Sequence, residues 1–342
     1  MAGHADCAGH GWREHTTAQW LYRDTAWQPA EQRSGALMSS RDKNLIAVSR
    51  QHGVALILVM WITTLLAILL GSFALIARTE NLEARHLFDT TRARYAAEAG
   101  LNLAVFQLRL PDPTTRWVAD GRPNDFEYEG FKVSVAITDD SGKIDLNTAD
   151  VNILTQMFVG NGIDPAKADQ LAAAIIDWRD PDDLVSPNGA ELNEYKSAGY
   201  AYGPANKPFT TVSEMQQVIG MNYEIYRRIE PAITLYTGRG NASLAYGTFE
   251  ALMSTPGMTA DMANQIIQQR QLIPAGTPQT GLTGPDGTPI VADGGGLTYS
   301  IKSRATLPNG ASTLLDATIR MGGVGNEGRP YVVLRWRDGE AS

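Results

Sequence analysis

An uncharged run of 24 residues, from Val54 to Ala77, is the feature that most constrains how this chain folds. As an α-helix the run measures roughly 36 Å, at about 1.5 Å per residue, which is enough to span the hydrocarbon core of a bilayer. The residues just before it carry more positive than negative charge, with Arg41, Lys43 and Arg50 against Asp42. By the positive-inside rule this flank stays in the cytoplasm and the long remainder is exported. The sequence therefore predicts a single-pass membrane helix.

Helical patterning continues beyond the apolar run. From Arg78 to Leu110 there is no proline and a single glycine, Gly100. An apolar stripe with helical spacing follows, made of Tyr95, Ala99, Leu103, Phe106 and Leu110. We predict one helix from Val54 to about Leu110, roughly 85 Å long, that ends at Pro111 and Pro113. A simple signal-anchor remains the alternative, whereas no small-residue cleavage site of a secretory signal peptide follows Ala77.

Strand patterns lie on both sides of a helical stretch. Residues 126–140 alternate apolar and polar side chains and are predicted as one strand with a buried face. Residues 299–320 are typical of a hairpin around Pro308-Asn309-Gly310, and Tyr331–Trp336 is a further predicted strand. The pattern predicts a sheet domain, 78–141 and 292–342, interrupted by a helical insertion over 142–272. The Gly/Pro-rich residues 273–291 are a connecting loop.

Composition excludes several kinds of chemistry. The single cysteine is Cys7, and the only histidine after residue 53 is His86. The chain therefore has almost no histidine or cysteine from which to build a Ser-His, Cys-His or His-metal site. We predict that the protein is not an enzyme. The net charge of −8 also argues against broad attraction to nucleic acid.

The predicted insertion contains a weak internal repeat. Residues 145–179 and 241–270 each consist of a capping residue, an apolar helix, a glycine turn and a second helix ending in arginine. Residues 209–229 have a similar form, and all three resemble helix-hairpin-helix units, whose turns hold DNA phosphate. A membrane-anchored DNA receptor of an uptake system is therefore the alternative function. Against it, residues 142–272 carry 9 basic and 15 acidic side chains, a balance that repels a polyanion.

An acidic cluster lies inside the insertion, in residues 177–194. Six carboxylates fall in these eighteen residues: Asp177, Asp180, Asp182, Asp183, Glu191 and Glu194. Carboxylates packed this closely repel one another unless water or a cation separates them, and oxygen donors without His or Cys favour Ca²⁺ over Zn²⁺. Two interpretations stay open on these residues alone, a calcium site and a solvated loop that caps the preceding helix. A glycosidase carboxylate pair would need a cleft that spacing on one loop cannot establish.

The leader and first helix resemble a known family. A basic leader ending at Gly53, an immediate hydrophobic helix, an amphipathic continuation and then a sheet are similar to type IV pilin-like subunits. GVALILVMWITTLLAILL and RYAAEAGLNLAVFQL resemble, more narrowly, the minor pseudopilin protein K family of type II secretion systems, and KIDLNTAD and DWRDPDD extend the likeness. The implied fold class is α+β, a long pilin-like helix packed on an antiparallel sheet with a large all-α insertion between strands.

The resemblance implies how the N-terminus matures. In the family a prepilin peptidase cuts after the glycine and methylates the new N-terminus, which implies cleavage between Gly53 and Val54 and methylation of Val54. Most pilin-like subunits carry Glu as the fifth mature residue, but this chain has Leu58 there. A carboxylate in lipid is costly unless it is paired, and the first subunit of a filament has no earlier subunit to pair with. An apolar Leu58 therefore agrees with the tip position held by protein K.

The resemblance also implies boundaries, ligands and partners. Residues 1–53 form the leader and 54–77 the membrane part of the helix. Residues 1–37 are expected to reflect a mis-called start, with Met38 as the true start and a genuine cytoplasmic extension as the alternative.

Calcium binding in the family's helical domain carries over to Asp180, Asp182, Glu191 and Glu194, with less weight on Asp177 and Asp183. The expected partners are the I and J minor pseudopilins, the major pseudopilin and the prepilin peptidase, with an inner-membrane anchor, a periplasmic C-terminal domain and no nucleic acid.

Overall fold

The computed structural model describes residues 52–340, except 278, 280, 293–294 and 323–327. The predicted leader and its alternative start at Met38 lie outside the described residues, apart from the last two leader positions. The chain divides into two compact units, residues 1–68 and 69–342.

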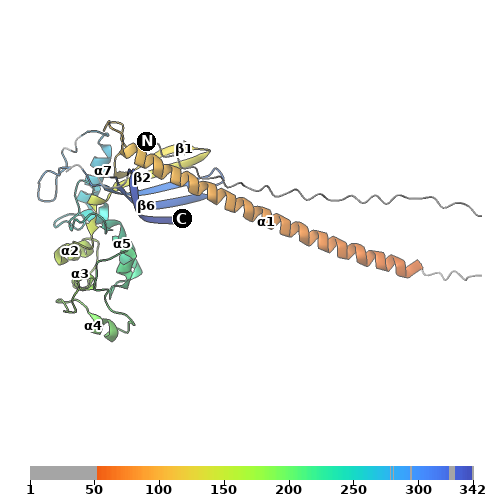
Figure 1. Ribbon diagram of the computed structural model, residues 1–342, viewed down its shortest axis with the longest axis horizontal. Coiled ribbons are helices and arrows are strands. Elements are labelled where there is room, and N and C mark those ends of the chain that lie inside the picture. The colour runs from red at the N-terminus through yellow and green to blue at the C-terminus, as the bar shows by residue number, and fades with distance from the viewer. Residues whose placement is uncertain (1–51, 278, 280, 293–294, 323–327, 341–342) are drawn as a thin grey trace, which may run out of the picture. The chain divides into compact units, whose positions relative to one another are not determined.

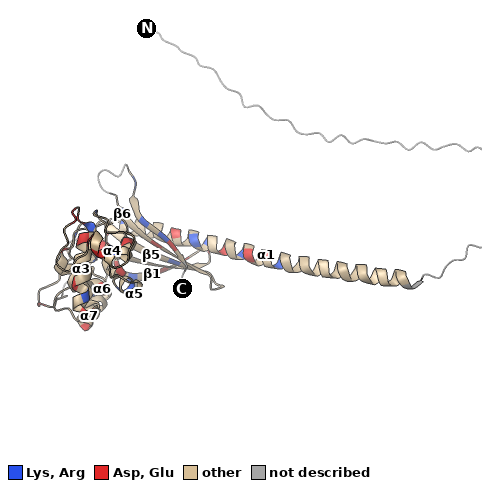
Figure 2. Cartoon of the chain, turned by 90° about the horizontal axis from the view of Figure 1, so that it is seen from below, with Lys and Arg blue, Asp and Glu red and all other residues tan. Residues whose placement is uncertain are grey.

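A single long helix, α1 (His52–Leu108), opens the described chain and confirms the predicted helix. Its first part carries no charged side chain, and this part is long and apolar enough to cross a membrane (Figure 2). The hydroxyls of Thr63 and Thr64 donate to the carbonyls of Val59 and Met60, at 2.9 and 2.7 Å, so neither needs an outside partner. Such internal pairing suits a hydrocarbon environment.

The sheet has five antiparallel strands in the order β1-β2-β5-β6-β7. Its strands are β1 (Asp120–Tyr128), β2 (Phe131–Asp139), β5 (Thr298–Thr306), β6 (Ser312–Met321) and β7 (Tyr331–Glu340). The predicted hairpin is confirmed as β5–β6, with Gly310 at φ 88° in its turn. The last strand is confirmed as β7.

The prediction of one strand over 126–140 is wrong. Glu129 and Gly130 adopt φ values of 47° and 82° and break the segment into β1 and β2, which pair in register from Tyr128 and Phe131. Two successive left-handed residues form the tight turn that suits the twist of a hairpin. The Glu-Gly dipeptide inside the alternating run was the available signal.

The second half of α1 covers one face of the sheet (Figure 1). Small and apolar residues of α1, among them Ala93, Ala97, Leu101 and Ala104, are buried against strand residues such as Val133, Val135, Ile301 and Ala317. Gly100 lies so close to the sheet that a Cβ on it would be 2.2 Å from Ser303 Oγ. The alanine and glycine spacing thus sets how near the helix approaches the strands.

The chain between β2 and β5 is mostly helical. It contains η1 (Asp140–Gly142), β3 (Ile144–Asp145), α2 (Val151–Gly160), α3 (Pro165–Arg179), α4 (Leu192–Ser197), η2 (Val212–Gln217), α5 (Tyr223–Ile229), η3 (Glu230–Ala232), β4 (Ile233–Thr234), α6 (Phe249–Leu252) and α7 (Ala260–Leu272). The fold is therefore α+β, with a long N-terminal helix, an antiparallel sheet and further helices, as predicted. The exact domain boundaries stay a prediction.

The helical hairpins of this region share one construction. The turns contain Gly162, Gly220 and Gly257, each with φ near 79°, a conformation that suits glycine. The arginines that end α3 and α7 reach back in the same way: Arg179 donates to the Leu146 and Ala149 carbonyls, and Arg270 donates to the Ala245 and Gly247 carbonyls. The repeated arginine therefore ties each second helix to the segment before its first helix.

Candidate functional site

The face of α1 that points away from the sheet exposes three large aromatic side chains. Phe88, Tyr95 and Phe106 are 63%, 64% and 59% exposed. At about 100° per residue, their side chains project within roughly 20° of one another, on the side opposite Ala97 and Ala104. In the predicted stripe, the side chains of Tyr95 and Phe106 are exposed, and those of Ala99, Leu103 and Leu110 are half-buried. This arrangement provides a lengthwise apolar surface for another helix.

The predicted processing residues lie in the first turns of α1. Gly53 is the second residue of the helix, and Val54 and Leu58 are 68% and 55% exposed. No described charged residue lies in this part of the helix before Arg78. Cleavage and methylation stay predictions.

The acidic cluster occupies the loop between α3 and α4. Asp177 is fully buried in the last turn of α3, and Asp180 follows the end of that helix. Glu191 directly precedes α4 and is 3% exposed. Gly189 packs on the Asp177 carboxylate, where a Cβ would be 2.0 Å from Oδ2. The end of the loop is thus folded back onto the Asp177 carboxylate, whereas residues 181–185 are exposed to solvent.

Three carboxylate oxygens in this loop are buried and make no hydrogen bond of normal geometry to a described residue: Asp180 Oδ1 and both oxygens of Glu191, whose carboxylate faces the Glu194 N–H in a capping box. Burial raises the pKa of Glu191 to about 7, with further contributions from Asp177, Asp180, Asp183 and Asp182. Burial and the neighbouring carboxylates also raise the pKa of Asp180. A buried acceptor that lacks a donor costs about 1–3 kcal/mol, and a cation removes that cost.

The other acids of the cluster have backbone or amide partners. Glu194 Oε2 accepts from the Glu191 N–H at 2.9 Å, and Asp182 Oδ1 accepts from the Leu184 N–H at 2.9 Å. Asp183 accepts from the Asn206 side-chain amide at 2.9 Å. Across the described residues, no three Asp, Glu, His or Cys side chains converge in an arrangement that could hold a metal ion.

Calcium binding at this loop stays a prediction, and the buried oxygens of Asp180 and Glu191 are the candidate ligands. The structure brings Asp180 and Glu191 together with Asp177, whereas Glu194 is engaged at the start of its own helix. Oxygen donors and orphaned carboxylate atoms are what Ca²⁺ takes as ligands. Asp180 and Glu191 would hold the ion, and Asp177 would add its charge from beneath.

Asp177, which has less weight in the sequence-based set, is fully buried. Sequence reasoning also missed a cluster of aromatic side chains at the end of α3. Trp178 contacts Tyr195 and Phe209, with ring centroids 6.1 and 6.2 Å apart. The available signal was the placement of Trp178 on the same helix face as the apolar residues Leu171 and Ile175.

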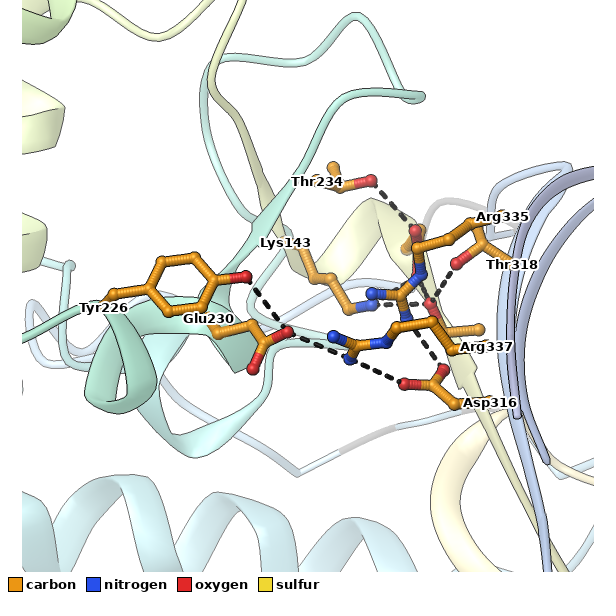
Figure 3. Close-up of polar contacts among 10 residues, drawn as sticks. Lys143, Tyr226, Glu230, Thr234, Asp316, Thr318, Arg335 and Arg337 are labelled. Carbon is orange, nitrogen blue, oxygen red and sulfur yellow. Dashed lines mark hydrogen bonds and ion pairs between the residues drawn. The ribbon is translucent and has the colours of Figure 1, made fainter. Parts of the chain in front are cut away.

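A second polar centre joins the sheet to the helical region (Figure 3). Arg337 pairs with Glu230 of η3 at 3.0 Å and with Asp316 of β6 at 3.2 Å, and Arg335 pairs with Asp316 at 2.7 Å. Lys143 pairs with Asp140 at 2.7 Å. None of these contacts was predicted. The pairs of Arg335 and Arg337 join separate elements of the fold, whereas the Lys143–Asp140 pair is local.

Comparison with known proteins agrees with this architecture. Residues 134–238 match the family model described as type II secretion system protein K. Type II secretion system protein K of Klebsiella pneumoniae is 27% identical over 205 residues, which cover 54% of this chain and 62% of that one. The protein K of Dickeya chrysanthemi is 33% identical over 129 residues, 34% of each chain. The chain thus spans less than two thirds of the length of these relatives.

A solved structure shares the fold. The crystal structure of the GspK-GspI-GspJ complex from the type 2 secretion system of enterotoxigenic Escherichia coli matches with a TM-score of 0.50 at 17% identity. The match covers 78% of this chain and 99% of that chain.

The shared fold consists of a long N-terminal helix, an antiparallel sheet and further helices. The family model lies on β2 and the helical region that follows it. Over residues 134–238 the chain is similar to the type II secretion system protein K family.

Proposed function

We propose that the protein is a minor pseudopilin of a type II secretion system, anchored in the inner membrane with its C-terminal domain in the periplasm. The observation that carries the proposal is the two-sided second half of α1. One side is buried on the sheet, and the other exposes Phe88, Tyr95 and Phe106. Because the exposed side continues the apolar membrane segment, neighbouring subunits could pack along the whole helix.

The proposed filament position is the tip. Leu58 stands where most pilin-like subunits have Glu, and an apolar residue suits a subunit with no earlier neighbour. Assembly then begins with this subunit, and the I and J minor pseudopilins and the major pseudopilin pack below it through their own helices. The helical region adds bulk beside the sheet, which fits a position where nothing stacks above.

Calcium is proposed as a structural ion of the loop between α3 and α4. Asp180 and Glu191 would bind it through oxygens that make no hydrogen bond of normal geometry to a described residue. Asp182 and Glu194 complete the proposed set, since the backbone contacts of each carboxylate leave one oxygen available. The ion would supply charge neutralisation and would hold α4 against α3.

Maturation provides the test of the proposed function. Prepilin peptidase is expected to cut between Gly53 and Val54 and to methylate Val54, which mass spectrometry of the first peptide of the membrane-derived protein would detect. Gly53→Val should block the cut and abolish secretion. Gly71→Val is the matched control, because no atom lies within 4 Å of a Cβ on Gly71. Normal processing and secretion of the Gly53→Val variant would contradict the proposal.

A further inference from the structure

The sheet face opposite α1 carries a charge balance unlike that of the whole chain. Alternate strand residues point to opposite faces, so the register identifies the charged positions on this outer face. They are the cations Lys132, Lys302, Arg304, Arg320, Arg335 and Arg337 and the carboxylates Asp120, Asp125, Glu127 and Asp316. The face is therefore net positive, although the chain has 37 acidic and 29 basic residues.

Three of these cations have no ion pair or hydrogen bond to any described residue. They are Lys132, Lys302 and Arg304, and all three are exposed. Lys302 and Arg304 are two residues apart on β5, so their side chains rise side by side from the middle strand of the sheet. Glu127 and Asp316 lie directly opposite Lys132 and Lys302 in the register. Arg304 instead faces Leu314 and Ser134, so its charge has no carboxylate directly opposite and attracts an outside anion.

A cleft opens on the same face, where the sheet meets η3. Its volume is about 270 Å³. The charged side chains lining it are the cations Lys143, Lys302, Arg335 and Arg337 and the carboxylates Asp140, Glu230 and Asp316. Four cations face three carboxylates, and the Nε of Arg335 is buried with no acceptor among the described residues. One added carboxylate would balance the charges and give that N–H an acceptor.

From this arrangement we propose that the outer sheet face is a docking surface for an acidic protein partner. The partner sets carboxylates over Lys302 and Arg304 and inserts one carboxylate into the cleft beside Arg335. A flat anionic membrane fits less well. Asp125, Glu127 and Asp316 are interspersed among the cations and would be repelled by a continuous sheet of phosphates, whereas a protein surface can avoid them.

The test uses the full chain in detergent and a fluorescein-labelled peptide of alternating Glu and Ser residues, with a Gln-Ser peptide as its neutral counterpart. Anisotropy should report binding of the acidic peptide that weakens as NaCl rises from about 25 to 150 mM. The double variant Lys302→Glu with Arg304→Glu should weaken binding at least about tenfold. Arg335→Gln should weaken it about threefold, through loss of the cleft donor.

Lys196→Glu with Arg227→Glu is the matched control, because it reverses one exposed lysine and one exposed arginine in the helical region. This variant should keep the wild-type affinity within about twofold. Equal loss in control and test variants, or no salt-sensitive binding by the wild type, would overturn the proposal. So would binding to phosphatidylglycerol vesicles that Lys302 and Arg304 govern while the peptide stays unbound. The readout does not depend on filament assembly, so it stands apart from the test of the proposed function.

Discussion

Gly100 of α1 and Ser303 of β5 are in closer contact than any side chain on residue 100 would allow. A Cβ there would be 2.2 Å from Ser303 Oγ and 3.0 Å from methyl carbons of Val133 and Val135. Helix and sheet therefore meet at this glycine, and its neighbours on three strand positions set the spacing between the two layers.

Gly100→Ala should lower the free energy of unfolding of the 69–342 unit by about 1–2 kcal/mol. Overpacking costs about 1–3 kcal/mol, and the better helix propensity of alanine returns up to about 1 kcal/mol. Denaturant titration of the full chain in detergent, followed by tryptophan fluorescence, measures the change. Gly71→Ala gains the same helix propensity at a position where no atom lies within 4 Å of the new Cβ. The stability of this variant should therefore not fall. Equal stability of the two variants would show that the contact at Gly100 relaxes freely.

Glu191→Gln should change stability in opposite directions with and without calcium. In EDTA the variant should melt higher than the wild type, because it removes a buried carboxylate beside Asp177 and Asp180. In calcium it should melt lower, because it loses a ligand; saturation at about 100 times Kd is worth about 2.7 kcal/mol to the wild type. Differential scanning fluorimetry of the full chain would measure both.

Asp169→Asn provides the control for calcium, because it removes an exposed carboxylate of α3 outside the loop. Its melting temperature should rise with calcium as much as that of the wild type. If EDTA leaves the wild-type melting temperature unchanged, the proposed ion is wrong.

Tyr95→Asp should impair assembly without unfolding the protein. The side chain is 64% exposed on the face of α1 away from the sheet, so a carboxylate costs little in the isolated chain. Packed against an apolar helix it would be desolvated without a partner, at a cost of several kcal/mol. Co-purification with co-expressed minor pseudopilins should fall at least tenfold. Tyr128→Asp, on an exposed tyrosine of β1, should leave it unchanged, and loss in both variants would mean that α1 is not the interface.

Asp139→Asn should alter how stability depends on pH. Burial raises the pKa of Asp139, although the N–H groups of Gly296 and Ser141 donate to it at 2.7 and 2.8 Å. Since the folded state holds this proton more tightly than the unfolded state, the wild type loses stability as pH rises through the folded pKa. The melting temperature of the variant relative to wild type should therefore be more favourable at about pH 8 than at about pH 5. An unchanged or reversed difference would contradict the assigned shift.

Local patterns were enough to predict much of the fold. The uncharged run and the absence of proline to residue 110 predicted α1, and the Pro308-Asn309-Gly310 turn predicted the β5–β6 hairpin. These features depend on neighbours within a few residues, where periodicity and turn chemistry are strong. The missed turn at Glu129 and Gly130 came from following the alternation alone and overlooking a glycine inside it.

The acidic loop was found by composition, but its inner arrangement was not. The family resemblance placed equal weight on Asp180, Asp182, Glu191 and Glu194. Only the packing of α3 against the loop decides that Glu191 is buried without a hydrogen bond of normal geometry to a described residue while Glu194 meets a backbone N–H.

By itself, the sequence determined that the chain has a membrane-length helix, a stripe that continues it, alternating strands and a dense group of carboxylates. These features follow from the order of residues along the chain, and they form through interactions between near neighbours in the sequence. The tertiary structure alone decided which side of α1 remains open, and it brought Lys302 and Arg335 to the cleft shared with Glu230. Such contacts join distant segments, and their free energy depends on burial and charge that exist only once the chain has folded.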